Sequence, residues 1–524
     1  MVTTMSCMLL ASHHVSGGVT GFFALLLVAL IACLALEEKL HAKKSLIAGL
    51  FAVACLLLGA IFNVLPFDRV VVGSHELVEV ERVEGEYILD TDPEQTHPID
   101  LGENGFGTES EASEEEHIHI GGHRLDMPVY IPGINWSVIA IILGSSLFVD
   151  VTSKSGLFTW IAIKVTKASL GDPLKLLWFY GIMTVVFSAV LNNVTAMIIV
   201  GSLTAVSLEK LGRRDKLLGF LLTEGLLTNI GGLLTLISSV PNIIVGTTAH
   251  IIFVTFFIKA APYVVVTTGI TIWMGARFFD VRRIATQAER DTASQLVASF
   301  DENDGVQSWG FFWFGGGMLV LFIICIATAS VLPANINHLG MGFIAMAFAC
   351  VMLTRYKSEV DQFYKSVDWD LLGFFMALFV VIYVMEHAMV LEAVGHVIQS
   401  AAVDIKAAAA DWRDTVMLLI GAATLSSVTD NIPLAAMLSS ILASLGAPIA
   451  GGSTVESGLW WSVVFGANLG GNLTPIGSAS TLVAVTIIHK HKLPMTFVGF
   501  IKAALPFAIA QIALATLYVL LFLR

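Results

Sequence analysis

Charged side chains are scarce in this chain of 524 residues, because only 13% of its residues are Asp, Glu, Lys or Arg. Soluble domains carry about 25% charged and 45–50% apolar residues, whereas 56% of this sequence is hydrophobic. The hydrophobic residues form runs such as 21–36, 46–65 and 313–332, each long enough to cross about 30 Å of hydrocarbon. Roughly a dozen such runs exclude a soluble globular protein and predict an all-α polytopic membrane protein.

Cysteine is also rare, and two further classes of protein are excluded by what the sequence lacks. The five cysteines lie mostly inside apolar runs and have no metal-ligand spacing, so we interpret them as small core side chains. No Gly-x-x-x-x-Gly-Lys loop is present, so ATP-driven transport within this chain is not indicated. We predict no enzyme activity, no cofactor and no nucleic-acid partner.

The formal net charge of −13 comes from one segment. Residues 66–128 contain 17 acidic and three basic residues, a local net charge of −14, and the remainder carries +1. His117, His119 and His123 lie in this segment and form a pattern that can collect a divalent metal. Since no cysteine or second cluster accompanies them, a solvated acidic loop is the favoured interpretation.

Basic residues mark the side of the membrane on which each loop lies, because Lys and Arg in short loops stay cytoplasmic. Clusters of them lie within residues 39–44, 164–175, 210–216, 277–290, 355–365 and 490–492. Placing all of these clusters inside puts both termini and the 66–132 loop on the extracytoplasmic side of a cell inner membrane.

The apolar stretch from Leu176 to Leu208 has basic clusters on both sides, so both of its ends are predicted to be cytoplasmic. Two full spans do not fit comfortably in about 33 residues, and Asn192 and Asn193 interrupt the middle of the stretch. We predict a re-entrant hairpin of two short helices that meet at a polar tip inside the protein, where non-helical backbone is tolerated.

A second copy of this pattern follows along the chain. Residues 188–195 (Ser-Ala-Val-Leu-Asn-Asn-Val-Thr) align with 426–433 (Ser-Ser-Val-Thr-Asp-Asn-Ile-Pro) at an offset of 238, and 229–239 align with 468–478 at an offset of 239. Acidic residues flank the second hairpin, which predicts that it opens outside. Two copies of opposite orientation form an inverted repeat, the usual construction of secondary transporters.

The repeat sets the predicted division of the chain. It comprises N-terminal transmembrane helices (1–65), the acidic extracytoplasmic loop (66–132), a first transport repeat (133–276), a cytoplasmic linker (277–308) and the second, inverted repeat (309–524).

Glycine pairs follow the asparagines of both copies, at 231–232 and 470–471. Each glycine costs about 1 kcal/mol in a helix interior, so these positions favour a broken helix. Unwound carbonyls, Asn amides and Ser or Thr hydroxyls replace the water around a small cation, whereas free N–H groups at half-helix N-termini bind an anion. Asn192, Asn193 and Asn431 are candidate substrate contacts, although turn and cap roles explain them as well.

Four carboxyl groups are candidates for proton coupling. Asp430 is the foremost, because an ionised carboxylate inside a membrane costs about 2.5–3.5 kcal/mol or more; it can exchange a cation for a proton, or cap the following helix. Glu224 precedes the first glycine pair and either carries a proton or pairs with a nearby cation. Asp150 and Glu386 align at an offset of 236, but an interfacial polar contact is the favoured interpretation of both.

The motifs at 188–194, 229–246, 426–436 and 460–485 resemble those of the ion transporter superfamily. That group includes NhaD-type sodium/proton antiporters, arsenite efflux permeases, the melanosomal P protein and sodium-coupled dicarboxylate transporters. The resemblance runs from about residue 136 to 524 and is strongest to the P-protein/NhaD-like branch. It implies a scaffold domain, a transport domain with two hairpins and two broken helices, a homodimer and an elevator mechanism.

The resemblance also implies a set of ion-binding residues at the tips and breaks. They are Asn192, Asn193, Thr195, Asn229, Gly231, Gly232, Thr235, Thr429, Asp430, Asn431, Asn468, Gly471, Thr474 and Ser478. A sodium ion at the hairpin tips is the corresponding hypothesis.

Two departures from the branch remove negative charge. Asn192 stands where this branch commonly has Asp, and residues 238–242 (Ser-Ser-Val-Pro-Asn) replace Gly-Asp-Pro-Pro-Asn. The predicted function is a secondary active transporter in a lipid bilayer that moves a small inorganic ion by alternating access. Sodium/proton antiport is the leading hypothesis, and an anion transporter for arsenite, or for a carboxylate with sodium coupling, is the alternative.

Overall fold

The computed structural model describes residues 15–523 with several gaps. The gaps are 36–39, 41, 66–69, 73–77, 84–85, 90–115, 119–122, 126–127, 129, 192, 304, 330–335, 359, 395–411, 429–430 and 445–457. Within the described residues, nine helices are long and apolar enough to cross a membrane. The prediction of an all-helical polytopic membrane fold is confirmed for this part of the chain.

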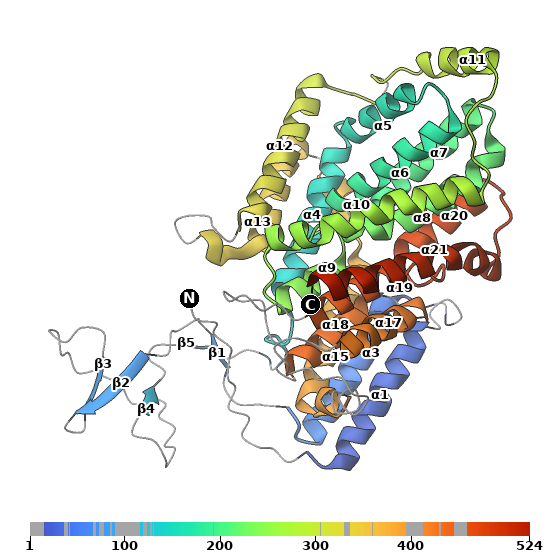
Figure 1. Cartoon of the computed structure of the whole chain (residues 1–524). Helices are drawn as coiled ribbons and strands as arrows, with labels where there is room; N and C mark the ends of the chain where they lie inside the picture. The colour runs from blue at the N-terminus through green and yellow to red at the C-terminus, as the bar shows by residue number, and fades with distance from the viewer. Residues whose placement is uncertain are drawn as a thin grey trace.

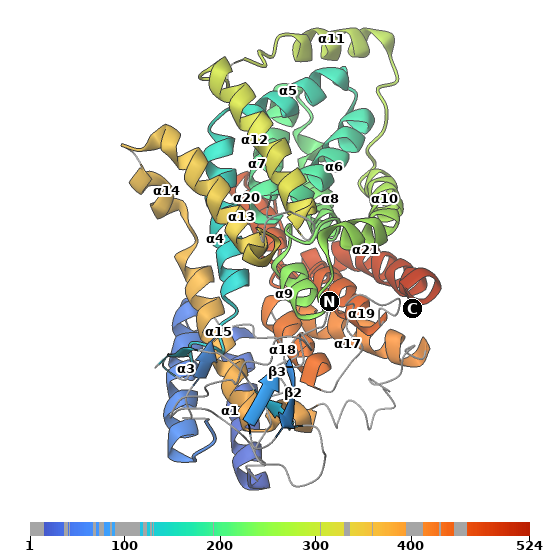
Figure 2. The same ribbon diagram turned by 90° about the vertical axis from the view of Figure 1, so that its left-hand side faces the viewer.

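Two helices near the N-terminus pack against a helix from the second half of the chain. Helices α1 (Gly17–Ala35) and α3 (Lys44–Ile61) lie beside α15 (Trp369–His387), as both views show (Figures 1 and 2). The backbone N–H of Ser45 donates to Asp370 Oδ1 at 3.3 Å, so the N-termini of α3 and α15 lie at the same end. Helix α4 (Trp136–Ser153) pairs in the same way with α13 (Ile336–Leu353).

The segment between α3 and α4 contains five short strands that the sequence analysis did not predict. Strand β1 (Val70–Val72) pairs antiparallel with β5 (His123–Leu125). In a second sheet, β2 (Val78–Val83) lies between β3 (Glu86–Leu89) and β4 (Glu116–Ile118), again antiparallel. The strands belong to the acidic loop and not to the helical part.

Two helices that are buried on all sides form the centre of the molecule. In α8 (Leu217–Gly232) all residues but Leu218 are buried, and in α19 (Gly458–Gly470) every residue is buried. A helix that is apolar and covered on every face belongs in a core. Helix α8 is surrounded by α6 (Pro173–Val190), α7 (Asn193–Lys210), α10 (Phe253–Phe278) and α20 (Ala479–Lys490), and α19 by α17 (Trp412–Val428), α18 (Asn431–Ser444) and α21 (Phe497–Tyr518).

The remaining helices lie outside this centre. They are α5 (Leu157–Ala168), α9 (Val240–Thr248), α11 (Gln287–Ala298), α12 (Trp309–Ala327) and α14 (Val360–Ser366), with short 3-10 turns at Arg214–Lys216 and Thr354–Tyr356 and a π-helical end at Val519–Leu523.

Both central helices end at a glycine pair, as the sequence predicts. After Gly232 the chain is not helical again until Val240, and after Gly470 not until Ala479. The glycines are also sites of close helix packing. A Cβ on Gly231 would lie 2.7 Å from the carbonyl oxygen of Val185, and a Cβ on Gly470 would meet the backbone of Ala423.

The first hairpin is present, but its arms are longer than expected. Helix α6 ends at Val190, Leu191 is extended with φ −95° and ψ 166°, and α7 begins at Asn193. Each arm has 18 residues, which correspond to about 27 Å of helix. Helix α6 begins early because Asp172 caps it by accepting a hydrogen bond from the Lys175 N–H, and helix α7 continues to Lys210. In the second pair, α17 ends at Val428 and α18 begins at Asn431.

The linker between the two halves is attached to α5. Glu302 pairs with Lys164, with 2.7 Å between Oε1 and Nζ, and with Lys167. Lys210 Nζ lies 4.6 Å from the ring centroid of Phe300. Basic residues of α5 and α7 thus meet the linker at one end of the molecule, as expected if these clusters share one side of a membrane.

We predict that alanine at either central glycine separates the helices. Gly231→Ala or Gly470→Ala should destabilise the protein by about 1–3 kcal/mol, because the added methyl group overlaps backbone atoms that cannot move aside easily. Thermal unfolding in detergent measures this effect. Gly269→Ala in α10 is the control, because a Cβ there meets nothing within 4 Å; an equal loss for Gly269→Ala would contradict the packing argument.

We predict that the linker is held by Glu302. The hydrogen bonds from Lys164 and Lys167 lower the pKa of Glu302 from 4.5 to about 2. Because the pKa of the folded state is depressed, the stabilisation from these ion pairs is fully present above about pH 4.5. It is lost as the pH falls towards 2. At neutral pH, Glu302→Gln should increase amide hydrogen exchange in residues 299–308, whereas Glu289→Gln on the exposed face of α11 should leave it unchanged.

Candidate functional site

Buried amide and hydroxyl side chains gather where the central helices break. Asn229 on α8 and Asn468 on α19 are both fully buried, and each is followed two residues later by a glycine pair. A buried amide must find partners within the protein, and both asparagines do so across the two halves of the chain. This network contains most of the predicted site residues that the structure describes.

Asn229 is the centre of the network. Its Oδ1 accepts hydrogen bonds from Ser478 Oγ at 2.9 Å, from Ser480 Oγ at 3.0 Å and from Asn193 Nδ2 at 3.2 Å. Its Nδ2 donates to Asn472 Oδ1 at 2.8 Å. One amide thereby connects the tip of the first hairpin with the break that follows α19.

Asn468 makes the reciprocal connection. Its Oδ1 accepts from Ser239 Oγ at 2.7 Å, and its Nδ2 donates to Asn242 Oδ1 at 2.9 Å. Asn242 in turn donates to the carbonyl oxygens of Gly232 and Thr235 in the first break, at 2.6 and 2.9 Å. Each central helix therefore supplies an asparagine to the break of the other helix.

Each hairpin is bound to its neighbouring central helix in the same way. Ser188 donates to the carbonyl oxygen of Thr228 and Ser426 to that of Ala467, both at 2.6–2.7 Å. Two further bonds run from the breaks to the hairpin backbone: Thr235 donates to Ala189 O, and Thr474 donates to Ser427 O. The matching positions are 238 or 239 residues apart, the offset found in the sequence.

The helix α6 side of the first tip is buried by protein, whereas Asn193 at the start of α7 is half-buried. Leu191 and Ser188 have no exposed surface, and Ser188 Oγ donates to Asn193 Oδ1 at 2.7 Å. A Cβ on Gly232 would lie 2.5 Å from Asn193 Oδ1. Only glycine at position 232 therefore allows the Asn193 side chain to reach α8.

Three predicted site residues lie outside the described residues: Asn192, Thr429 and Asp430. Thr195 is half-buried on α7, and Asn431 is buried at the start of α18, which packs against α9 and α19. A Cβ on Gly471 would lie 2.8 Å from that of Ser478, so this glycine allows the second break to fold back.

The proton-coupling candidates are placed very differently. Glu224 is fully buried on α8. Its Oε1 accepts from Thr204 Oγ1 at 2.6 Å, and its Oε2 has no hydrogen-bond partner among the described residues. Asp150 is half-buried on α4, and Glu386 is exposed near the end of α15.

Sequence reasoning missed Ser239 and Asn242, the partners of Asn468, and three further residues of the network. Asn472 donates to the carbonyl oxygen of Leu226 and to Gln511 Oε1, at 3.1 and 2.8 Å, and Gln511 donates to Thr271 Oγ1 at 3.1 Å. Ser480 is the third. Asn472 aligns with Leu233 in the first copy, so the repeat gave no signal for it. A polar side chain within an apolar stretch was the available signal for Gln511 on α21.

No cluster of three or more His, Cys, Asp or Glu side chains suited to a metal ion occurs among the described residues. The oxygen atoms at the breaks are amide, hydroxyl and backbone carbonyl oxygens. Such neutral oxygen ligands suit a small hard cation.

Nine candidate spans around two interrupted helices, with a buried polar network at the breaks, define a multi-pass integral membrane transporter rather than an enzyme.

The chain belongs to the CitMHS family. The family profile, described as "Citrate transporter", matches residues 120–466. Curated relatives include the "46 kDa membrane protein" of Mycobacterium leprae, 29% identical over 74% of this chain and 86% of that protein, and the "Uncharacterized transporter Rv2684" of Mycobacterium tuberculosis, 30% identical over the same shares.

The predicted resemblance to the P protein is confirmed. The human P protein is 24% identical over 76% of this chain, which spans 55% of the length of that relative. Among solved structures, the Alcanivorax borkumensis YdaH transporter matches with a TM-score of 0.54 and 13% identity, over 91% of this chain and 98% of that chain. This likeness concerns the fold alone.

We predict that Asn229 stabilises both halves. Asn229→Ala removes one hydrogen bond from each of Asn472, Ser478 and Ser480, and each buried group left unsatisfied costs about 1–3 kcal/mol. The unfolding temperature in detergent should fall clearly for Asn229→Ala. It should change little for Thr486→Ala, because the Thr486 hydroxyl is exposed and bonds only to the Leu482 carbonyl oxygen of its own helix. A stable Asn229→Ala protein would show that the network is not structural.

Proposed function

We propose that this protein is a proton-coupled secondary transporter, with sodium/proton antiport as its leading activity. A cation would bind at the helix breaks, and Glu224 would carry the proton. The observation that carries this proposal is the fully buried Glu224 carboxyl group, one oxygen of which has no partner among the described residues.

The position of Glu224 suits coupling between a proton and a cation. A buried carboxylate with a single hydrogen bond is costly unless a proton or a nearby cation neutralises it. Glu224 precedes Asn229 by five residues on α8, about 7.5 Å along the helix axis. A cation at the breaks would favour release of the Glu224 proton, and a proton on Glu224 would favour release of the cation.

The buried charges favour a cation over an isolated anion. Among the described residues, the buried ionisable side chains of Asp, Glu, Lys, Arg and His are Asp172, Glu224 and Asp414, all of them acidic. The sequence places Asp430 at the second tip as a further carboxyl group. Acidic groups without buried basic ones repel an anion and attract a cation.

The breaks supply oxygen ligands of the right type. Asn229 Oδ1 accepts hydrogen bonds from Asn193 Nδ2 and Ser478 Oγ at 3.2 and 2.9 Å, so oxygens of all three side chains lie near one another. These oxygens can turn to a dehydrated cation without moving the backbone. The departure from the branch at Asn192 and Ser239 lowers the local negative charge, so we expect moderate affinity for sodium.

We further propose that the hairpins and breaks form inverted repeats with re-entrant tips. Hydrogen bonds that recur at an offset of 238 or 239 support the internal repeat. Burial of the first tip against α8 supports re-entrance, because a tip at the far membrane surface would be exposed to water. An elevator motion, a homodimer, an inner-membrane location and extracytoplasmic termini complete the proposal.

Carboxylate transport coupled to a cation is the second candidate. The family profile is described as a citrate transporter, and helices α7, α9, α18 and α20 all begin at the breaks or hairpin tips. Their N-terminal N–H groups favour negative charge. Under this proposal the cation at the breaks would bind together with the carboxylate.

Proteoliposomes with an imposed pH gradient test the proposal. Addition of sodium should drive proton movement in the wild type, and Glu224→Gln should abolish it, because the amide keeps the shape of the side chain but cannot release a proton. Glu209→Gln on the exposed part of α7 is the control and should retain full exchange. Unchanged exchange in Glu224→Gln would refute the role of Glu224.

The same vesicles distinguish the two candidate functions. Lithium, potassium, arsenite, citrate and other dicarboxylates replace sodium in turn. Sodium-dependent proton movement without any added carboxylate supports antiport, whereas uptake that requires both sodium and a carboxylate supports the second candidate. Asp430→Asn should abolish antiport, and an anion transporter should tolerate this neutral substitution.

A further inference from the structure

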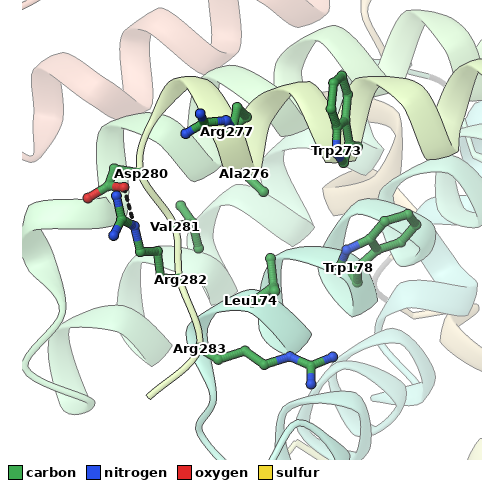
Figure 3. A pocket seen from close by; sticks show the side chains of 9 residues that line it. All are labelled: Leu174, Trp178, Trp273, Ala276, Arg277, Asp280, Val281, Arg282 and Arg283. Carbon is green, nitrogen blue, oxygen red and sulfur yellow. Dashed lines mark hydrogen bonds and ion pairs between the residues drawn. The ribbon is translucent and has the colours of Figure 1, made fainter. Parts of the chain in front are cut away.

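A basic pocket lies outside the polar network, where the beginning of α6 meets the end of α10. The cavity measures about 310 Å³ and is lined by residues 174 and 178 of α6, residues 273, 276 and 277 of α10, and residues 280–283 that follow α10. Figure 3 shows its side chains. None of these residues belongs to the site proposed above.

The charge of the pocket is strongly positive. Its lining contains three arginines, Arg277, Arg282 and Arg283, and a single carboxylate, that of Asp280, which pairs with Arg282 (Figure 3). Arg282 Nε lies 2.6 Å from Asp280 Oδ1. Arg277 and Arg283 are exposed and have no acidic partner in the part of the chain that the structure describes. The lining therefore carries two positive charges that no acidic side chain among the described residues neutralises.

The other side of the pocket is aromatic and continues into an apolar surface. Trp178 and Trp273 lie together on the side away from Asp280 (Figure 3), and Trp273 is 63% exposed. Tryptophan is enriched where a protein meets the boundary between hydrocarbon and water. The two tryptophans are therefore the type of side chain expected at the level of lipid head groups.

The helices that form the pocket expose apolar side chains further along. On α6 these are Phe179, Ile182 and Val186, which are 36%, 46% and 50% exposed and share one face of the helix because they are three and four residues apart. On α10 Val265 and Val266 are exposed as well. Helices α6 and α10 are in contact, since a Cβ on Gly181 would lie 2.7 Å from Ile272 Cδ1.

This combination selects a ligand with an anionic head and an apolar tail. Arginine binds phosphate oxygens with two parallel hydrogen bonds and is more weakly hydrated than lysine. Basic pockets between transmembrane helices on the cytoplasmic side suit acidic lipid head groups, and the basic cluster 277–290 is predicted to be cytoplasmic. A free phosphate ion would make no use of the tryptophans or of the apolar faces.

We propose that the pocket binds the phosphate group of an anionic phospholipid, whose acyl chains lie along the exposed faces of α6 and α10. Arg277 and Arg283 hold the phosphate, and Trp178 and Trp273 contact the glycerol and carbonyl region. The lipid lies at the base of α6, the helix that leads to Ser188 and the first hairpin tip. It would therefore hold the end of α10 against the hairpin.

The full-length protein in detergent micelles tests this proposal. Dioleoylphosphatidylglycerol is titrated into the wild type and into the Arg277→Gln/Arg283→Gln variant, and the unfolding temperature is followed at each concentration. A bound lipid stabilises the folded state by mass action. The wild type should be stabilised at low lipid concentration, and the apparent affinity should fall roughly fivefold for each arginine removed.

Two comparisons decide the source and the place of binding. Dioleoylphosphatidylcholine has the same acyl chains without net charge, and glycerol 3-phosphate has the phosphate without acyl chains. Neither should stabilise the protein at the concentrations at which phosphatidylglycerol does. Equal stabilisation by phosphatidylcholine would overturn the proposed charge recognition, and equal stabilisation by glycerol 3-phosphate would overturn the assignment to a lipid.

A matched variant controls for general loss of positive charge. Arg355→Gln/Lys357→Gln also removes two exposed basic residues, which lie outside the pocket. This variant should retain the wild-type affinity for phosphatidylglycerol, and an equal loss would overturn the pocket as the binding site.

Unfolding in lipid-free micelles shows whether either variant folds. If the double variant does not fold, the single variants Arg277→Gln and Arg283→Gln each remove one charge, and wild-type affinity in both would equally refute the proposal.

Discussion

The backbone inside a bilayer must satisfy its hydrogen bonds within the protein, and the rest of this structure depends on how two broken helices meet that requirement. Helices α8 and α19 stop at glycine pairs and leave polar groups at membrane depth. The breaks persist because hydroxyl and amide side chains bind the freed backbone. Asn242 donates to the Gly232 and Thr235 carbonyl oxygens, and Thr474 donates to the hairpin backbone.

The connections between the two breaks are reciprocal, and this has a mechanical consequence. Asn229 bonds to Ser478 and Asn468 bonds to Ser239, so neither half satisfies its buried amide without the other. Buried polar networks rigidify the parts that they join. Any motion that changes access to this site would therefore carry both breaks together, which agrees with the proposed movement of one transport unit.

Glu224 differs from the network in a way that suits coupling. The asparagines have several partners each, and a fully satisfied neutral network gains little from adding or losing a proton. Glu224 has one partner at 2.6 Å and a second oxygen without one among the described residues. The neutral oxygens would thus select the ion, while the carboxyl group would set the exchange with protons.

The sequence by itself determined the membrane class, the resemblance to a transporter family and the two glycine pairs at which the central helices end, because these depend on local composition and on motifs that occur twice. It also identified Asn193, Asn229 and Asn468. Only the tertiary structure decided which groups these asparagines bind, since the partners are up to 251 residues away, as for Ser480 and Asn229. Asn472 and Gln511 have no counterpart in the repeat. The length of helices α6 and α7 depends on capping residues outside the apolar run. The basic pocket exists only because α6 packs on α10. Long-range packing leaves no periodic trace in a chain, which is the physical reason that sequence patterns could not reveal these features.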